Sequence, residues 1–455
     1  MAGFIEKHAV WSDEQRRLAA ELGARIRGAN LRLIRLAWAD PHGASRAKAV
    51  TVPVFLEALK NGYNINVATT TLDSAGGRVF ASFTQGGGMG LEEMTGSPNL
   101  SIVPDPATFR VLPWAPGVGW ILCDEYFNNG KPFHFSPRQL LKRLLRDLHG
   151  KGHELRIGLE VEWYLARVAE ESLNDEHVGI PGLRGRPIRT SPAEPGYSYH
   201  SESNMDLMQP VLGALAETYE ALGLPLRSIE NEWGPGQVEC TFSAAGALQA
   251  CDDLLLFRTA TRQVCRRLGH FATFMARPAL KGYYASGWHL HQSLVDAKTG
   301  ENRFTPVAGH EPLSALGRAY SAACSRTRLP QPYSPHRRSM AIGASNPIRS
   351  PRIGPAGPTI TAAPWYGSSA ARAIRRRAWR TAWASPRRIP ICSLRRKSLP
   401  ASMASSTSAT PGRRISTPTT PGVRCCRRSS PKRWMRWTRT RCSGGSSGTC
   451  SSTIT

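Results

Sequence analysis

Two acidic side chains at alternate positions are the first feature of this sequence that could do chemistry. In LRIGLEVEWYL, residues 155–165, the alternation of a strand places Glu160 and Glu162 on one face and apolar residues on the other. Neighbouring carboxylates repel and raise each other's pKa unless a cation lies between them. The pair therefore indicates either a cation site or a charged face exposed to solvent.

A second acidic group surrounds a Gly-Pro turn. In SIENEWGPGQVECTF, residues 228–242, Glu230 and Glu232 precede the turn and Glu239 follows it. A hairpin at this turn would bring Glu232 close to Glu239. An ordinary hairpin with exposed acids is the alternative.

The third segment adds imidazoles. In GYYASGWHLHQSL, residues 282–294, a strand would place His289, His291 and Ser293 on one face. Two imidazoles on one face suit a metal site or an anion site, although HxH alone is more often structural. Together, carboxylates and histidines on strands of one domain predict a site for hard divalent cations that handle phosphate.

These three segments, in this order and spacing, resemble the glutamine synthetase family. That family has ExE on a strand, then E…PGQxE, then SGxHxHQSL. EEMTGSPNLSIVPDPATFRVLPWAPGVGWILCDEYFNNGKP, residues 92–132, is similar to the family's segment between a small β-grasp domain and the catalytic domain. The resemblance covers residues 30–320.

The resemblance implies ATP and two Mg²⁺ or Mn²⁺ ions as cofactors. The catalytic and metal-binding residues that it implies are Glu160, Glu162, Glu232, Glu239 and His289. Glu160 and His289 would help to hold the ion that contacts the γ-phosphate of ATP, and the other three glutamates would hold the second ion. His291 and Ser293 would lie along the nucleotide phosphates.

The reaction implied by the resemblance joins glutamate to ammonia. ATP phosphorylates the γ-carboxylate of glutamate, and ammonia attacks the acyl phosphate to give glutamine. Tyr284 and Ala285 stand where the family usually has Asn-Gly or Asn-Ala. The sequence therefore resembles family members that ligate other amines, such as polyamines, about as closely as it resembles true glutamine synthetases. The family also implies a homo-oligomeric ring with active sites shared between neighbouring subunits.

The helices and strands that the sequence predicts around these residues indicate an α+β fold. A helix is expected over 13–28, with Asp13 as its cap, and an amphipathic helix over 136–152, with Ser136 as its cap. Residues 31–40 alternate as a strand does, and residues 49–62 run from a strand into a short helix. By resemblance, residues 1–133 form the N-terminal β-grasp domain with its connecting segment, and residues 134–322 form a catalytic α/β barrel-like domain. No run reaches roughly 18 apolar residues, so a cytoplasmic protein without a membrane partner is expected.

The net charge of +26 comes from one part of the chain. Residues 321–455 contain 26 Lys and Arg, 24 of them Arg, and neither Asp nor Glu, whereas residues 1–320 hold 33 basic and 33 acidic residues. A basic tail predicts nucleic-acid binding through counterion release, which is the alternative function from another class. Because a change of reading frame also accounts for this composition, no specific nucleic-acid partner is expected.

Loss of one base near codon 321, a frameshift, would produce such a tail. Each later codon would then carry the intended third base, nearly always G or C in a GC-rich gene, in its middle position. Asp, Glu and Lys all need A in the middle position, whereas Arg, Gly, Ser, Pro, Thr, Ala, Cys and Trp use G or C there. The acid-free and arginine-rich composition follows from this change of frame.

Two stretches of the tail can be translated back. RTAWASPRRIPICS, residues 380–393, can encode ENRVGEPAANPYLF when read one base back, and RRSMAIGASNPIRSPRIG, residues 337–354, can encode PTINGYRRFQPNSLAPDR. Both strings resemble glutamine synthetase segments, and the first includes a Glu-x-Arg that would supply a missing metal ligand and a substrate-binding arginine. We therefore expect residues 323–455 to be a non-native, disordered tail and this chain to be inactive.

Overall fold

The computed structural model describes residues 2–27, 30–81, 83, 88–306 and 311–326. The tail predicted to be disordered lies outside these residues, except for 323–326. Those four residues form the end of α7 (Ala315–Arg326), so the expectation of disorder is wrong for them. The segment ALGRAYSAACSR is rich in alanine, which has the highest helix propensity, and this favours a helix.

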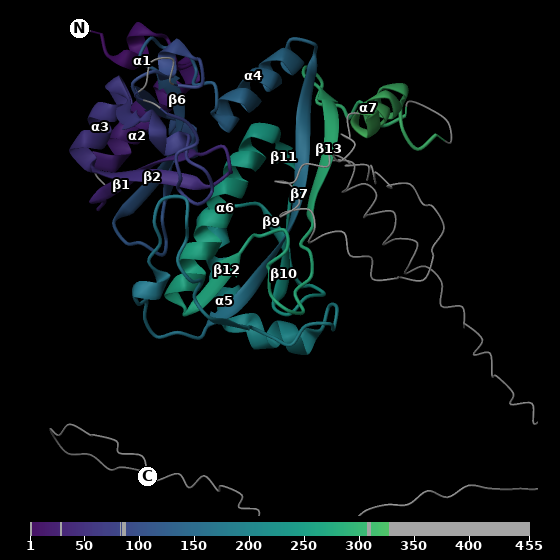
Figure 1. The fold of residues 1–455 in the computed structure, drawn as a ribbon. Coiled ribbons are helices and arrows are strands. Elements are labelled where there is room, and N and C mark those ends of the chain that lie inside the picture. Colours follow the sequence, from purple (N-terminus) through teal and green to yellow (C-terminus); the bar gives the residue numbers. More distant parts are fainter. Residues whose placement is uncertain (1, 28–29, 82, 84–87, 307–310, 327–455) are drawn as a thin grey trace, which may run out of the picture. The chain divides into compact units, whose positions relative to one another are not determined.

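A six-stranded mixed sheet occupies the N-terminal part (Figure 1). Its strands, in spatial order, are β2 (Ser45–Thr51), β1 (Leu33–Ala39), β6 (Val118–Phe127), β4 (Asn99–Pro104) and β3 (Tyr63–Asn66), with β5 (Arg110–Val111) paired to β6. The helices of this part are α1 (Phe4–Lys7), α2 (Asp13–Arg27) and α3 (Val52–Asn61). The structure confirms the strand over 31–40 and the strand-to-helix change within 49–62.

One helix start differs from the prediction. Asp13 is the first residue of α2, and Ser12 takes the role of its cap. The Ser12 hydroxyl accepts a hydrogen bond from the Gln15 amide at 3.2 Å, and the Gln15 side chain accepts one from the Ser12 amide at 3.1 Å. This reciprocal pair is a capping box, which satisfies two backbone donors at once.

The second sheet is built on one long strand, β7 (His153–Val168). Its pairing partners along one edge are β11 (Ala245–Gly246), β10 (Gln237–Phe242) and β8 (Thr190–Pro192), and along the other edge β13 (Trp288–Asp296) and β12 (His270–Thr273). β9 (Leu226–Asn231) pairs with β10. Within the described residues this sheet is open, so the closed barrel stays a prediction.

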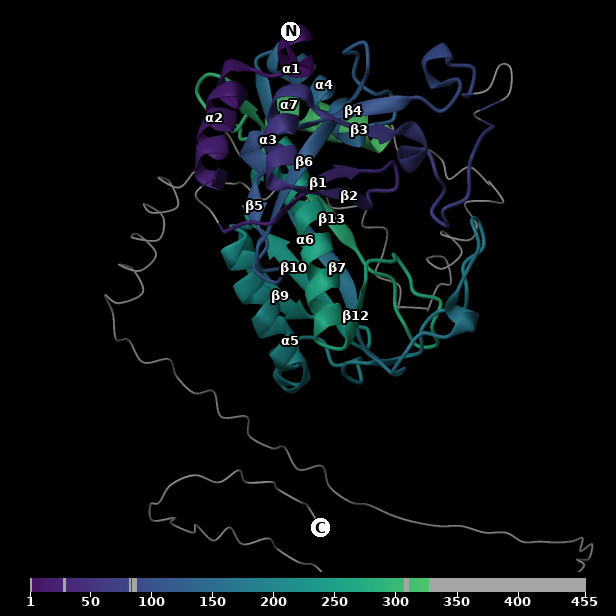
Figure 2. The same cartoon turned by 90° about the vertical axis from the view of Figure 1, so that its left-hand side faces the viewer.

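Two helices cover one face of this sheet (Figure 2). α5 (Glu202–Ala221) and α6 (Ala247–Arg267) pack against the face that carries Val161, Trp163 and Leu165, all of them buried. Glu160 and Glu162 alternate with these residues and face the other way, as the period of a strand requires. The remaining elements are the 3₁₀ turns Val67–Thr70, Glu92–Met94, Pro106–Thr108 and Asp175–His177.

The helix predicted over 136–152 is α4 (Pro137–His149), and Ser136 caps it as expected. Its burial differs from the amphipathic pattern, because Leu140 and Leu144 are exposed while Arg138 is buried. The Arg138 guanidinium donates hydrogen bonds to Asp105, Asp124 and Asp252 at 2.6 to 2.9 Å. Those acids come from the N-terminal sheet and from α6, so one arginine links the two parts.

A buried carboxyl on β6 makes a first prediction. Glu125 is 1% exposed, and its Oε1 atom has no hydrogen-bond partner among the described residues. Burial raises the pKa of Glu125 to about 8, with a further contribution from the charge of Asp124. The folded state therefore prefers the protonated acid, whereas the unfolded chain ionises near its ordinary value of 4.5.

We expect the free energy of unfolding to fall as the pH rises from about 4.5 to 8. In this range the Glu125 carboxyl loses its proton in the unfolded chain but keeps it in the folded protein. Glu125→Gln keeps the shape and removes the titration. Urea unfolding at pH 5.5 and 8.5 should show the parent losing roughly 2–3 kcal/mol more than the variant over this interval. Equal losses in the two proteins would contradict the assignment.

No helix in the described part of the chain combines the length and apolarity that a membrane span requires.

Candidate functional site

Three neighbouring strands carry the acidic and imidazole side chains to one face of the second sheet. β10 pairs with β7 so that Glu239 lies opposite Glu162. β13 pairs with the other edge of β7 so that His289 lies opposite Glu160. Side chains opposite each other on neighbouring strands have Cβ atoms about 5 Å apart. The register therefore gathers these residues from three separate stretches of the sequence.

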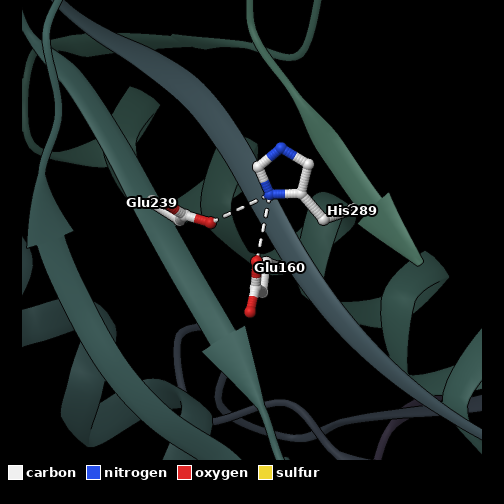
Figure 3. Close-up of side chains that lie close together, drawn as sticks. All are labelled: Glu160, Glu239 and His289. Carbon is white, nitrogen blue, oxygen red and sulfur yellow. Dashed lines mark hydrogen bonds and ion pairs between the residues drawn. The ribbon is translucent and has the colours of Figure 1, made fainter. Parts of the chain in front are cut away.

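Glu160, Glu239 and His289 form the centre of the site (Figure 3). The Nδ1 atom of His289 lies 3.0 Å from Glu160 Oε2 and 3.6 Å from Glu239 Oε1. One donor atom from each of the three residues lies within 4.8 Å of the other two. Such a set of oxygen and nitrogen donors can surround one divalent cation.

Glu232 follows the end of β9 and joins this centre through Glu239. Burial raises the pKa of Glu239, and a hydrogen bond with Glu232 and the charges of Glu162 and Glu160 raise it further. Burial and the charge of Glu232 also raise the pKa of Glu162. A cation among these glutamates would offset the repulsion between their carboxylates, so the raised pKa values of Glu239 and Glu162 fit a metal site.

The sequence interpretation missed Gln237 as a positioning residue. Its side chain is 1% exposed, and its Nε2 atom donates to Glu162 Oε2 at 2.7 Å. Its Oε1 atom accepts from the Gly234 amide at 2.8 Å, which fixes the turn before Glu239. The feature that could have pointed to Gln237 is a polar residue directly after the turn, at the start of a strand that is mostly buried.

Gly287 provides the space between two of the donors. A Cβ atom at this position would lie 2.6 Å from His289 Nε2 and 2.7 Å from Glu162 Oε1, closer than carbon atoms approach such groups. The absence of a side chain therefore leaves room for Glu162 of β7 and His289 of β13 beside Gly287.

His291 and Ser293 lie further along the same face of β13. The Nε2 atom of His291 is 3.0 Å from Glu160 Oε1, without the angles of a hydrogen bond. The Ser293 hydroxyl is buried and has no partner in the described part of the chain. Buried polar atoms normally have partners, so both are available to a bound group.

All seven residues predicted as site residues thus occur on or beside these strands. Glu239 contacts Glu232, which is expected at the same ion, and also His289, which is expected at the other ion. Carboxylate oxygens with one or two imidazoles suit Mg²⁺ or Mn²⁺, and the unpartnered His291 nitrogen fits the same group.

A cavity of about 640 Å³ is lined by none of these site residues. It is lined by residues between Ala169 and Arg189. Its Glu170 carboxylate already accepts hydrogen bonds from Arg186, Arg189 and His177. These groups satisfy one another, so the cavity offers no reactive set comparable with the glutamates.

Comparison with protein families matches the glutamine synthetase catalytic domain over residues 134–326. The gamma-glutamylanilide synthase of an Acinetobacter species is 40% identical over 359 residues, which cover 74% of this chain and 72% of that protein. The glutamate–isopropylamine ligase of a Pseudomonas species is 30% identical over 293 residues, which cover 63% of this chain and 59% of that protein.

A solved structure of a GmaS/ADP complex has a similar fold. The superposition gives a TM-score of 0.51 at 25% sequence identity and covers 66% of this chain and 61% of that chain. This chain therefore spans between about three fifths and three quarters of the length of these three relatives.

Proposed function

This chain belongs to the glutamine synthetase family of ligases, and we propose that its first 322 residues are part of an enzyme that joins glutamate to an amine at the cost of ATP. The observation that carries the proposal is the group Glu160, Glu239 and His289 on one sheet face, in a chain with high similarity to a gamma-glutamylanilide synthase. The resemblance of the three motifs to the family supports the same reaction.

In the proposed reaction the γ-carboxylate of glutamate takes the terminal phosphoryl group of ATP, leaving ADP. The amine nitrogen then attacks the carbonyl carbon, the carbon–oxygen bond to phosphate breaks, and phosphate and a proton leave. Mg²⁺ or Mn²⁺, when bound, would supply charge neutralisation at the phosphate oxygens.

The residues of this chain would bind and orient the reactants. Glu162, Glu232 and Glu239 would hold one ion, and Glu160 and His289 would help to hold the second. Gln237 keeps Glu162 in place through its hydrogen bond. His291 and Ser293 would lie along the nucleotide phosphates, with polar atoms that the described residues leave unpartnered. Holding both reactants in line is the main contribution that a protein makes to such a transfer.

Ammonia is the second candidate for the nitrogen donor, and it was the first expectation from the motifs. One of the relatives reported above is named for an anilide product and another for isopropylamine as its substrate, which favours an amine. Tyr284 and Ala285, which depart from the family pattern, lie beside the site: the Tyr164 hydroxyl donates to the Tyr284 carbonyl at 3.0 Å.

The test is an assay of the protein with its reading frame restored. It is incubated with ATP, glutamate and Mg²⁺ and with one nitrogen donor at a time: ammonium, methylamine, isopropylamine or aniline. Mass spectrometry should detect a γ-glutamyl amide for at least one amine, with ADP formed in equal amount. Absence of any amide, or formation of glutamine alone, would contradict the proposed amine ligase.

We also propose that the frame of the gene changes between codons 320 and 324. The acid-free composition of residues 321–455 and the two strings recovered from it support this change. The chain as it stands would then lack the arginines and the further glutamate that the family uses beyond this point, and would be inactive. Resequencing codons 318–326 tests the idea, which fails if restoring one base opens no family-like frame.

The domain boundaries belong to the same proposal. Residues 1–133 would form the N-terminal domain and its connecting segment, 134–322 the catalytic domain, and 323–455 the out-of-frame tail. Assembly of the intact enzyme into a ring, which the family resemblance implies, and a cytoplasmic location, which was expected from the sequence, are further parts of it.

A further inference from the structure

Three large aromatic side chains stand exposed beside the glutamates. Tyr197, Tyr199 and Trp233, which we call the aromatic wall, are 47%, 54% and 42% exposed. Each ring presents a large apolar area to water, and three such rings beside one another offer a surface that a ligand can cover. Their position next to the proposed catalytic residues makes them candidates for binding a substrate.

The chain holds two of these rings in fixed positions. The Tyr197 amide donates to the Trp233 carbonyl at 2.7 Å, and the two rings meet edge to face with centroids 5.8 Å apart. The Tyr197 hydroxyl also donates to the carbonyl of Gly282. Backbone and side chain therefore fix the wall before any ligand binds, which lowers the entropy cost of binding.

The wall lies directly against the acidic site. Trp233 follows Glu232, and its amide donates to the Glu232 carboxylate at 3.1 Å. The Tyr199 ring stacks on His200 at 3.9 Å, and His200 Nε2 lies 3.4 Å from Glu230 Oε2. Partial burial and the charges of Glu232 and Glu239 raise the pKa of Tyr199, which agrees with its place at the edge of the site.

The charges around the wall distinguish two kinds of amine. An alkylamine is protonated at neutral pH, and an ammonium group on an aromatic surface needs a free carboxylate nearby or a desolvated ring. The carboxylate of Glu230 is already engaged by the Ser228 hydroxyl at 2.6 Å and by His200. Glu194 is buried and accepts hydrogen bonds from the amides of Gly196 and Gly236. Glu232 and Glu239 are among the residues proposed to hold divalent ions. An arylamine is uncharged at neutral pH and needs an aromatic platform rather than a counter-ion.

We propose that Trp233, supported by Tyr197 and Tyr199, is the specificity-determining platform of the amine subsite and selects an aromatic amine. This inference rests on the proposed function, since it names the class of amine that the same site accepts. It extends that function by assigning the choice of amine to three residues that the family motifs described above do not specify.

The test measures binding to the full-length chain and requires no turnover. Saturation-transfer NMR compares aniline with cyclohexylamine, which has a ring of the same size but is cationic and not aromatic. With Mg²⁺ and ADP present, aniline should give a signal several-fold stronger than cyclohexylamine. Trp233→Ala should reduce the aniline signal at least about fivefold, and Trp233→Phe should retain most of it, because it keeps an aromatic face.

Phe135→Ala is the matched control, because Phe135 is an exposed aromatic residue next to α4. This variant should bind aniline like the parent. Circular dichroism of each variant verifies that it is folded, and Trp233→Leu, which also lacks an aromatic face, replaces Trp233→Ala if the latter unfolds. A cyclohexylamine signal equal to or stronger than that of aniline would overturn the inference, as would an aniline signal in Trp233→Ala or Trp233→Leu as strong as in the parent.

Failure of this inference and failure of the proposed function can be told apart. If the restored enzyme forms an amide but the wall does not bind aniline, only the inference is wrong. If aniline binds through Trp233 but no amide forms, the platform stands as a binding site and the ligase function is wrong.

Discussion

Replacing Arg138 by Met should unfold the protein or come close to it. Arg138 is 7% exposed in its side chain and meets three aspartates, of which Asp124 and Asp105 are equally buried. Although burial opposes ionisation, the charges of Arg138 and Lys142 hold the pKa of Asp124 below its ordinary value. Removing the arginine leaves Asp105 and Asp252 without their cation and leaves Asp124 with Lys142 alone. Breaking a buried ion pair in this way typically costs about 3–5 kcal/mol.

The control for this substitution is Arg143→Met on the exposed side of the same helix. Thermal unfolding of both variants, followed by tryptophan fluorescence, should show a large loss for Arg138→Met and a change within about 0.5 kcal/mol for the control. A stable Arg138→Met protein would show that the four-residue cluster does not join the N-terminal sheet to α6.

The second large effect is expected at the metal site. Glu160→Gln keeps the size of the side chain but removes the charge that faces both His289 and His291. The affinity for Mn²⁺, measured by titration calorimetry or by the EPR signal of free Mn²⁺, should fall at least about tenfold, since even residues that only orient a metal ligand have effects of this size. The substitution should not weaken the fold, because it relieves repulsion.

Glu171→Gln serves as the comparison, because Glu171 is an exposed acid outside the site. It should bind Mn²⁺ like the parent. Equal affinity in the parent and in Glu160→Gln would mean that the acidic face of β7 is not where the ion binds.

Much of the candidate site could be predicted because strand periodicity is a local property. Alternation along 155–165 and 282–294 assigned Glu160 and Glu162 to one face of their strand and His289 to one face with His291. In the structure both histidines lie beside Glu160 on the face of the sheet that carries the site. The register was not predictable in the same way. That His289 lies opposite Glu160 depends on pairing between residues about 130 positions apart, which no single segment specifies.

Residues with unusual burial were the hardest to predict. An amphipathic pattern points leucines inward, yet α4 exposes Leu140 and Leu144 and buries Arg138. A buried arginine is stable only when its counter-charges are present, and here they come from three distant parts of the chain. Gln237 was missed for a similar reason, because its role depends on the separate strand that carries Glu162.

The central claim is that this chain carries the first part of a glutamate–amine ligase and that one restored base would complete it. The most direct measurement compares the chain as it stands with the frame-restored protein for ADP formation that requires glutamate and an amine together. We predict such activity in the restored protein and none in the chain as it stands. Equal activity in both, or none in the restored protein with any amine, would contradict the account.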